Sequence, residues 1–267
     1  MTDPPLRLAV GAMGTRFELV LLAGRGDLRA AGEAAIDEIE RWHRRLSRFA
    51  PDSLVSHINR EAARAPVRLD RDTFELLQDA VDVWRASDGA FDITVAPAMT
   101  SDAGALRMDA DAWTIAFASP DMSIDLGGIG KGHALDCAAR ILREAGVACA
   151  LLHGGTSSIV AIGAPEGSDG WRVALPSGGD ERTVALRDAA ISVSDPFGPR
   201  EARREASHIM NPGQAAPVAE SIRASVVGPS ARLADAWSTA LVVLGRVPAG
   251  FPPQFSAFID APEAVLS

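Results

Sequence analysis

Residues 124–136 read Ile-Asp-Leu-Gly-Gly-Ile-Gly-Lys-Gly-His-Ala-Leu-Asp, and the rest of the chain is best interpreted outward from them. An apolar run at 122–126 precedes four glycines in six residues, and a helical pattern follows the glycines. A strand, glycine loop and helix in this order lets backbone N–H groups approach an anion closely at the helix N-terminus. The stretch therefore predicts an anion-binding loop, with a tight structural turn that binds nothing as the alternative.

Lys131 lies inside this loop and is the only lysine in the chain, because the other 25 of the 26 basic residues are arginine. One lysine in a glycine loop suggests a site that needs a compact ammonium group. Two familiar phosphate loops are excluded. A dinucleotide fingerprint beginning at Gly128 would need glycine or alanine where His133 stands, and a P-loop would need serine or threonine where Gly132 stands.

The composition describes an ordinary globular protein of 267 residues, with 47% hydrophobic and 23% charged residues. A net charge of −9 without a basic run argues against a nucleic-acid partner. No apolar segment reaches about 18 residues, so we expect no membrane segment. Cys137 and Cys149 are expected to be buried thiols, which suits a reducing compartment. We therefore expect a cytoplasmic protein, although a processed exported form would have the same sequence features.

Hydrophobic spacing and turn residues predict the secondary structure. Asp27 is expected to cap a helix whose apolar stripe runs from Leu28 to Leu46 and on to Phe49. The other predicted helices span 53–60, 73–86, 131–145 and 231–244. The predicted strands are a pair within 6–23, followed by 113–117, 122–126, 148–152, 158–163, 171–175, 183–186, 190–194 and 222–227.

This mixture predicts an α+β fold with mixed, largely antiparallel sheets and packed helices. We expect one domain over residues 1–267, and two lobes of about 1–120 and 121–267 are the alternative arrangement of that domain.

A second informative stretch is the helix predicted at 231–244. Asp235 and Thr239 stand four residues apart on one face, so their oxygens can meet one hard cation such as Mg²⁺. A solvated helix face is the alternative, but the surrounding small apolar residues imply that the carboxylate has a partner.

Histidines supply the remaining candidates. His208 can act as a base or donate a hydrogen bond to a phosphate, with a structural role as the alternative. His153 precedes another glycine turn and is a candidate for the same cleft, whereas His43 and His57 lie on predicted helices and are interpreted as structural.

Five motifs occur in an order that resembles the ApbE-type FAD:protein FMN transferases, and the resemblance covers about residues 13–245. The motifs are Met13-Gly14-Thr15, Asp88-Gly89-Ala90-Phe91-Asp92, the glycine loop at 125–132, His208 to Pro212, and Ala234-Asp235 with Thr239-Ala240. The resemblance implies an Mg²⁺-dependent α+β protein related to tunnelling folds. It also implies transfer of FMN from FAD to a Thr or Ser hydroxyl of an acceptor protein, with release of AMP. Some members of the family instead hydrolyse FAD to FMN and AMP.

The resemblance also assigns candidate site residues by position. The metal ligands that it implies are the Gly128 carbonyl, Asp235 and Thr239. The flavin-nucleotide site that it implies consists of Met13, Phe49, Ala90, Phe91, Asp92, Asp125, Lys131 and Met210. His208 matches the histidine that assists transfer, and Lys131 would neutralise the pyrophosphate.

Four positions depart from the family pattern. Phe49 stands where tyrosine is usual, so stacking on a ring survives but a phenolic hydrogen bond does not. His133, Thr156 and Asn211 replace an aromatic residue, an acidic or amide residue and an aspartate. The departures bear on the balance between transfer and hydrolysis more than on flavin binding. The alternatives to transfer are an FAD pyrophosphatase on the same site and a flavin-binding module without catalysis.

Overall fold

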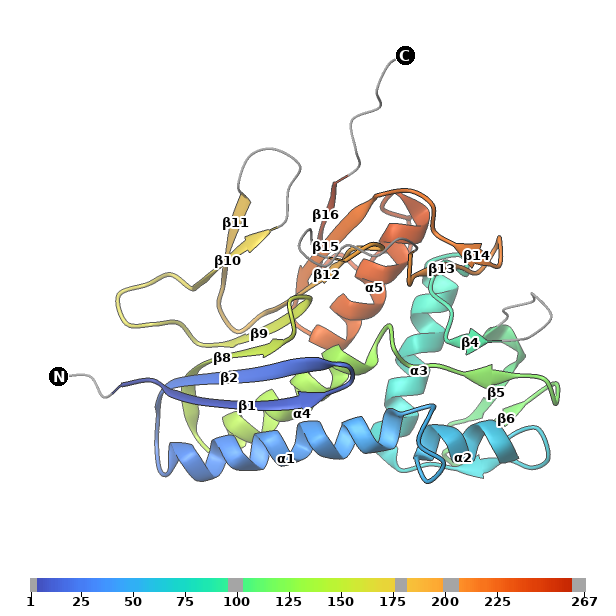
Figure 1. Cartoon of the computed structure of the whole chain (residues 1–267), viewed down its shortest axis with the longest axis horizontal. Coiled ribbons are helices and arrows are strands. Elements are labelled where there is room, and N and C mark those ends of the chain that lie inside the picture. Colours follow the sequence, from blue (N-terminus) through green and yellow to red (C-terminus); the bar gives the residue numbers. More distant parts are fainter. Residues whose placement is uncertain (1–3, 96–102, 176–181, 199–206, 261–267) are drawn as a thin grey trace, which may run out of the picture.

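The computed structural model describes residues 4–95, 103–175, 182–198 and 207–260, and Figure 1 shows the arrangement of their helices and strands. The helices are α1 (Leu28–Leu46), α2 (Leu54–Glu61), α3 (Arg71–Ala86), α4 (Gly130–Glu144) and α5 (Ala231–Leu244). All the strand pairings among these residues are antiparallel, which agrees with the predicted α+β fold of largely antiparallel sheets.

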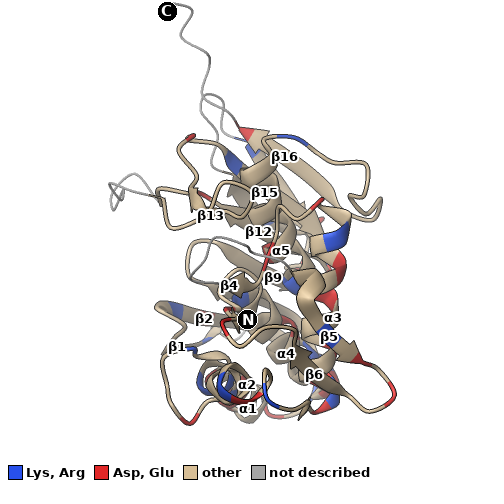
Figure 2. Cartoon of the chain, turned by 90° about the vertical axis from the view of Figure 1, so that its right-hand side faces the viewer, with Lys and Arg blue, Asp and Glu red and all other residues tan. Residues whose placement is uncertain are grey.

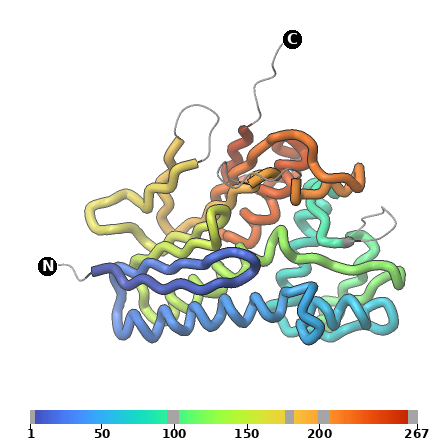
Figure 3. The backbone as a smooth tube through the Cα atoms, in the orientation of Figure 1, coloured from blue at the N-terminus to red at the C-terminus, as the bar shows by residue number. Residues whose placement is uncertain are grey.

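The main sheet has seven strands in the order β1-β2-β8-β9-β12-β15-β16. Their bounds are β1 (Leu6–Ala12), β2 (Thr15–Gly24), β8 (Val147–Gly154), β9 (Ser158–Ile162), β12 (Ala190–Ser194), β15 (Arg223–Gly228) and β16 (Ser256–Asp260). The two N-terminal strands therefore join a sheet that is otherwise built from the second half of the chain, as Figure 3 also shows.

Helices α1, α4 and α5 cover one face of this sheet, side by side in Figure 1. Their buried residues and the inward residues of the strands form one core that extends along the chain from Ala12 to Phe255. The other face carries the hairpin of β10 (Trp171–Leu175) and β11 (Arg182–Leu186), which covers a small separate apolar cluster around Leu186 and Ile191.

Smaller sheets lie beside α2 and α3. One joins β3 (Val67–Arg68), β6 (Thr114–Phe117) and β5 (Leu106–Asp109), and another joins β4 (Thr94–Val95) to β7 (Ser123–Ile124). A third joins β13 (Met210–Asn211) to β14 (Ala216–Pro217), and a short 3₁₀ helix spans Ala103–Ala105. Strand β7 leads directly into the glycine loop, so this part of the fold positions the start of α4.

Local sequence explains where the helices begin and end. Asp27 caps α1 by accepting hydrogen bonds from the backbone N–H groups of Arg29 and Ala30, and Ser53 caps α2 in the same manner. Gly146 follows α4 with a φ of 82°, a conformation that glycine adopts without steric cost. The predicted apolar stripe is wrong at its end, because α1 stops at Leu46 and Phe49 is 81% exposed.

Residues of both charge signs are interspersed along the chain, as the blue and red segments of Figure 2 show. Several pairs lie one helical turn apart, including Arg29 with Glu33 on α1 and Arg140 with Glu144 on α4. Such exposed pairs contribute little to stability. None of the helices that the structure describes is long and apolar enough to cross a bilayer.

Candidate functional site

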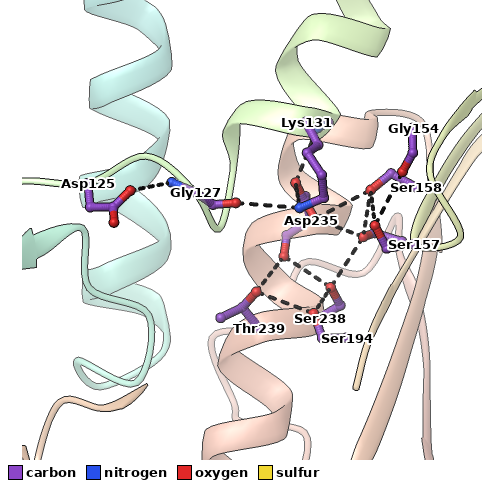
Figure 4. Close-up of polar contacts among 12 residues, drawn as sticks. Asp125, Gly127, Lys131, Gly154, Ser157, Ser158, Ser194, Asp235, Ser238 and Thr239 are labelled. Atoms are coloured by element: carbon purple, nitrogen blue, oxygen red, sulfur yellow. Dashed lines mark hydrogen bonds and ion pairs between the residues drawn. The ribbon is translucent and has the colours of Figure 1, made fainter. Parts of the chain in front are cut away.

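The predicted glycine loop is present and is held at its first residues. Asn59 on α2 both donates to and accepts from the backbone of Ile124, at 3.1 and 2.8 Å. One carboxylate oxygen of Asp125 accepts the N–H of Gly127 at 2.9 Å, and the other faces the Arg48 guanidinium at 3.2 Å. Asp125 therefore shapes the loop directly, and Figure 4 shows its hydrogen bond with Gly127.

A buried carboxylate, that of Asp235 on α5, contacts the end of this loop. Only 3% of Asp235 is exposed. Its Oδ2 accepts the backbone N–H of Gly132 at 3.1 Å and lies 3.5 Å from the Lys131 ammonium. Its Oδ1 accepts the hydroxyl of Ser192 at 3.0 Å and that of Ser158 at 3.5 Å. The structure thus supplies the partners that the apolar sequence around Asp235 implied (Figure 4).

Three further hydroxyls extend this cluster, those of Ser238 and Thr239 on α5 and that of Ser194 on β12. Thr239 Oγ1 donates to the backbone carbonyl of Asp235 at 3.1 Å and lies 3.3 Å from Ser194 Oγ. Ser194 Oγ also lies 2.8 Å from Ser238 Oγ. The Thr239 hydroxyl therefore lies against the backbone of Asp235, one helical turn away on α5.

Gly128 belongs to the same place in the fold. A Cβ atom on Gly128 would lie 3.7 Å from Thr239 Oγ1 and 3.0 Å from a ring carbon of Phe91. The glycine loop, the late helix and the 90–92 loop therefore meet there. Ala90 and Phe91 are both buried, and the Phe91 ring is the one of the two that packs against the loop at Gly128.

The helices α4 and α5 approach each other closely at this point. A Cβ atom on Gly132 would overlap the carbonyl oxygen of Ala231, so only glycine allows the approach. Asp136 on α4 accepts the N–H groups of Ala231 and Arg232 at 2.9 and 3.0 Å and the Ser230 hydroxyl at 2.8 Å. This carboxylate stabilises the N-terminus of α5 and so fixes the helix that carries Asp235 relative to the loop.

The remaining predicted site residues lie on neighbouring loops. Asp92 accepts hydrogen bonds from the backbone and hydroxyl of Thr94 at 2.7 and 2.6 Å, so it also stabilises its own loop. Phe49 lies in the loop between α1 and α2. The Arg48 guanidinium lies over its ring, with the guanidinium carbon 4.7 Å from the ring centre. Met210, on β13, is 51% exposed. Large apolar side chains exposed in this manner are available to a ligand.

His208 is exposed and precedes β13. Its Nδ1 lies 3.0 Å from the Pro196 carbonyl oxygen, which also accepts the His208 backbone N–H at 3.2 Å. Since a carbonyl oxygen only accepts hydrogen bonds, Nδ1 carries the hydrogen in this contact. Nε2 is then the ring nitrogen that can accept a proton.

Two other histidines have structural positions. His133 is 3% exposed and meets the Trp42 ring edge-on, and burial lowers its pKa to about 3. It is therefore a neutral core residue. On β8, His153 points to the side of the sheet opposite to that of its neighbours Leu152 and Gly154. It pairs with Ile159, which packs in the apolar cluster on the face away from α4 and α5, so His153 lies on that face too. The expectation that His153 lines the cleft is wrong.

The structure thus brings together Gly128, Lys131, Asp235 and Thr239 and adds four serines that the sequence reasoning missed. The missed residues are Ser158, Ser192, Ser194 and Ser238. The signal was present on β12, where Ser192 and Ser194 stand two apart in a strand that is otherwise apolar and therefore face the same side. Met13 lies apart from these hydrogen bonds, in the turn between β1 and β2.

Comparisons with known proteins agree with the sequence resemblance. The model of the ApbE family matches residues 13–250. A protein of Salmonella typhimurium named FAD:protein FMN transferase is 25% identical over 75% of this chain and 67% of its own length. One of the same name from Klebsiella pneumoniae is 26% identical over 82% of this chain and 71% of its own length. The crystal structure of the ApbE protein of Thermotoga maritima has a TM-score of 0.80, with 23% identity over 91% of this chain and 87% of that one, which shows the same fold.

Proposed function

Since the chain belongs to the ApbE family, we propose that it is an FAD:protein FMN transferase, the activity for which its relatives are named, and that its activity depends on Mg²⁺. In this proposal FAD is the donor, and FMN passes to a Thr or Ser hydroxyl of an acceptor protein with release of AMP. The observation that carries the proposal is the cluster of Asp235, Lys131 and the glycine loop. It combines a buried carboxylate, an ammonium and backbone N–H groups within one site.

The oxygens at this site fit a hard cation. Asp235 supplies a carboxylate, Thr239 a hydroxyl and Gly128 a backbone carbonyl, and Mg²⁺ prefers oxygen ligands of this type. The described residues contain no group of three or more His, Cys, Asp or Glu side chains suited to a metal. A site of one carboxylate with neutral oxygens suits Mg²⁺, which usually keeps several of its waters and binds substrate phosphates. When bound, the cation would neutralise charge on the pyrophosphate oxygens.

The chain's own residues account for the rest of the reaction. Lys131 would contact the pyrophosphate as a point charge, and the N–H groups of the loop would hold its oxygens. The acceptor hydroxyl oxygen bonds to the phosphorus of the FMN half, and the bond from that phosphorus to the bridging oxygen breaks, so that AMP leaves with the bridging oxygen. His208 Nε2 would accept the proton of the hydroxyl. Phosphoryl transfer depends mainly on such positioning and charge stabilisation.

Exposed apolar side chains would hold the flavin nucleotide. Phe49 offers an uncovered ring face for stacking, and Met210 offers a flexible apolar side chain. Asp125 is already paired with Arg48 and shapes the loop, so its role in binding would be to keep the loop open to the nucleotide.

Incubation of the protein with FAD and Mg²⁺ tests the proposal. A test protein that carries candidate Thr and Ser residues is added to half of the samples, and AMP is measured by chromatography. AMP that forms only with the acceptor, together with FMN covalently bound to it, supports transfer. AMP that forms equally without the acceptor would assign the site to FAD hydrolysis. FAD binding without AMP in either sample would leave a flavin-binding module.

A further inference from the structure

Two serines occupy positions of the main sheet that a core normally fills with apolar side chains. Ser158 on β9 and Ser192 on β12 lie directly opposite each other, against α5, and both are fully buried. Val160 and Ile162, which lie on the same face of β9, belong to the apolar core. A buried hydroxyl is costly unless it is hydrogen-bonded, and an apolar side chain would fill the space without that requirement. The two serines therefore need an explanation beyond packing.

Both hydroxyls donate to the same oxygen of Asp235. Oδ1 accepts the hydroxyl of Ser192 at 3.0 Å and that of Ser158 at 3.5 Å. The second oxygen, Oδ2, accepts the Gly132 N–H at 3.1 Å and lies 3.5 Å from the Lys131 ammonium. Each carboxylate oxygen has two lone pairs. Donors among the described residues therefore occupy both oxygens of this carboxylate.

These donors differ in how easily a cation can displace them. The Gly132 N–H belongs to the backbone of α4, and the serine hydroxyls are enclosed between the sheet and α5. Lys131 instead has a long, flexible side chain that is 23% exposed. Displacement of a serine would leave a buried hydroxyl without its charged acceptor, whereas the ammonium can move into water. A cation therefore reaches Asp235 at Oδ2, in the place of the Lys131 ammonium.

We propose that Ser192, together with Ser158, determines which cations the site accepts, because the two hydroxyls confine Asp235 to coordination through one oxygen. Ca²⁺ takes more oxygen ligands than Mg²⁺ and often binds both oxygens of a carboxylate, whereas Mg²⁺ keeps several waters. A carboxylate with one available oxygen thus favours Mg²⁺ over Ca²⁺. The proposal rests on the proposed function, since it takes Asp235 as a metal ligand, and it adds the basis of the selectivity of that site.

Cation titrations of the full chain without nucleotide test the proposal. Calorimetry measures the dissociation constants of Mg²⁺ and Ca²⁺ for the wild type, for Ser192→Ala and for the double variant that also carries Ser158→Ala. Loss of both hydroxyls frees Oδ1, from which Ca²⁺ gains a ligand and Mg²⁺ does not. The ratio of the Ca²⁺ to the Mg²⁺ dissociation constant should therefore fall about tenfold or more in the double variant, the scale of one hydrogen bond to a charged group. Ser192→Ala alone should give part of this fall.

Ser225→Ala is the matched control. Ser225 is also a buried serine of the main sheet, on β15, but it pairs with Val193, which packs in the apolar cluster on the face away from α5. Its replacement should leave the ratio of the two dissociation constants unchanged. An unchanged ratio in the double variant, or an equal fall in Ser225→Ala, would overturn the proposal.

Infrared spectroscopy measures the coordination itself and does not depend on the folding of a serine variant. The separation of the two carboxylate stretching bands differs between one-oxygen and two-oxygen coordination, and Asp235→Asn identifies the bands of Asp235. In the wild type, Asp235 should bind both cations through one oxygen, and two-oxygen coordination of Ca²⁺ would overturn the proposal. A wild type that binds no cation, or whose cation binding survives Asp235→Asn, would instead refute the metal site of the proposed function.

Discussion

Replacement of Lys131 with methionine should tighten the binding of a divalent cation in the absence of nucleotide. Without a metal, the Lys131 ammonium lies 3.5 Å from Asp235 Oδ2 and 3.4 Å from the Gly127 carbonyl oxygen. It therefore acts as a resident counter-ion for the carboxylate that we propose as a metal ligand. A cation that binds Asp235 must displace this ammonium or tolerate its repulsion, and Lys131→Met removes both costs.

The size of the effect follows from the distance. At 3.5 Å the attraction between the two charges is about 1.2 kcal/mol in bulk water and about 4.7 kcal/mol at an effective dielectric constant of 20. The lysine side chain is 23% exposed and that of Asp235 is 4% exposed, so partial solvent screening applies. We expect about 1.5–3 kcal/mol, which is about a ten- to hundredfold gain in cation affinity.

Calorimetric titration with Mg²⁺, or with Mn²⁺ followed by electron paramagnetic resonance, measures this gain. The melting temperature of the metal-free protein should fall in Lys131→Met, although its affinity for the cation rises. Without metal, Lys131→Met should melt lower than the wild type because Asp235 loses its charged partner, and saturating Mg²⁺ should close the difference. Turnover of FAD should nevertheless fall, because the ammonium no longer meets the pyrophosphate.

Arg140→Met is the matched control for this prediction. Arg140 is an exposed cation on the same helix, paired with Glu144, so its replacement removes one positive charge away from Asp235. It should leave cation affinity nearly unchanged. Metal binding by Lys131→Met that is equal to or weaker than that of the wild type would refute the idea that the lysine competes with the metal.

Three further predictions address other parts of the site. Asp235→Asn should abolish Mg²⁺-dependent turnover at ordinary magnesium levels, whereas Thr239→Val should lose less activity and recover partly in excess Mg²⁺; wild-type magnesium dependence in Asp235→Asn would contradict the metal assignment. His208→Ala should keep FAD affinity within a few-fold but lose about 10²–10⁴ in transfer rate, and unchanged transfer would return His208 to a structural role. Burial lowers the pKa of His133 from its ordinary value of 6.5 to about 3 in the folded protein, so the unfolded chain binds the extra proton and stability falls below pH 6.5. The fall should approach about 1.4 kcal/mol per pH unit and should largely vanish in His133→Phe, so equal urea midpoints for the two proteins across pH 5–7 would argue against a neutral buried histidine.

Local sequence predicted the elements whose signals are themselves local. The Asp27 cap and the three- and four-residue apolar spacing gave α1 its bounds, and Ser230 with Gly245 gave those of α5. The glycine loop was predicted for the same reason, because its strand, glycines and helix are contiguous. The predicted stripe failed only at Phe49, where the helix had already ended.

Partners that depend on sheet order could not be predicted in this manner. Asp235 required a partner, but Ser158 and Ser192 reach it only because β9 and β12 pair next to each other beneath α5. His43 is a similar case, since its position on a helix gave no indication that its Nδ1 accepts the backbone N–H of Met13, 30 residues away. The two-residue strands β13 and β14 lack the length for a periodic pattern, and they pair only with each other in a small separate sheet.

The donors to Asp235 are also far from it in sequence, which has a consequence for how the protein acquires its site. Gly132, Ser158 and Ser192 lie 103, 77 and 43 residues before it. During synthesis all of them leave the ribosome before α5 does, so the loop and the strands exist for a time without the carboxylate. Contacts over such separations close late and slowly. Cation binding at Asp235 should therefore appear only as the whole chain reaches its native state, which would make bound metal a sensitive reporter of completed folding.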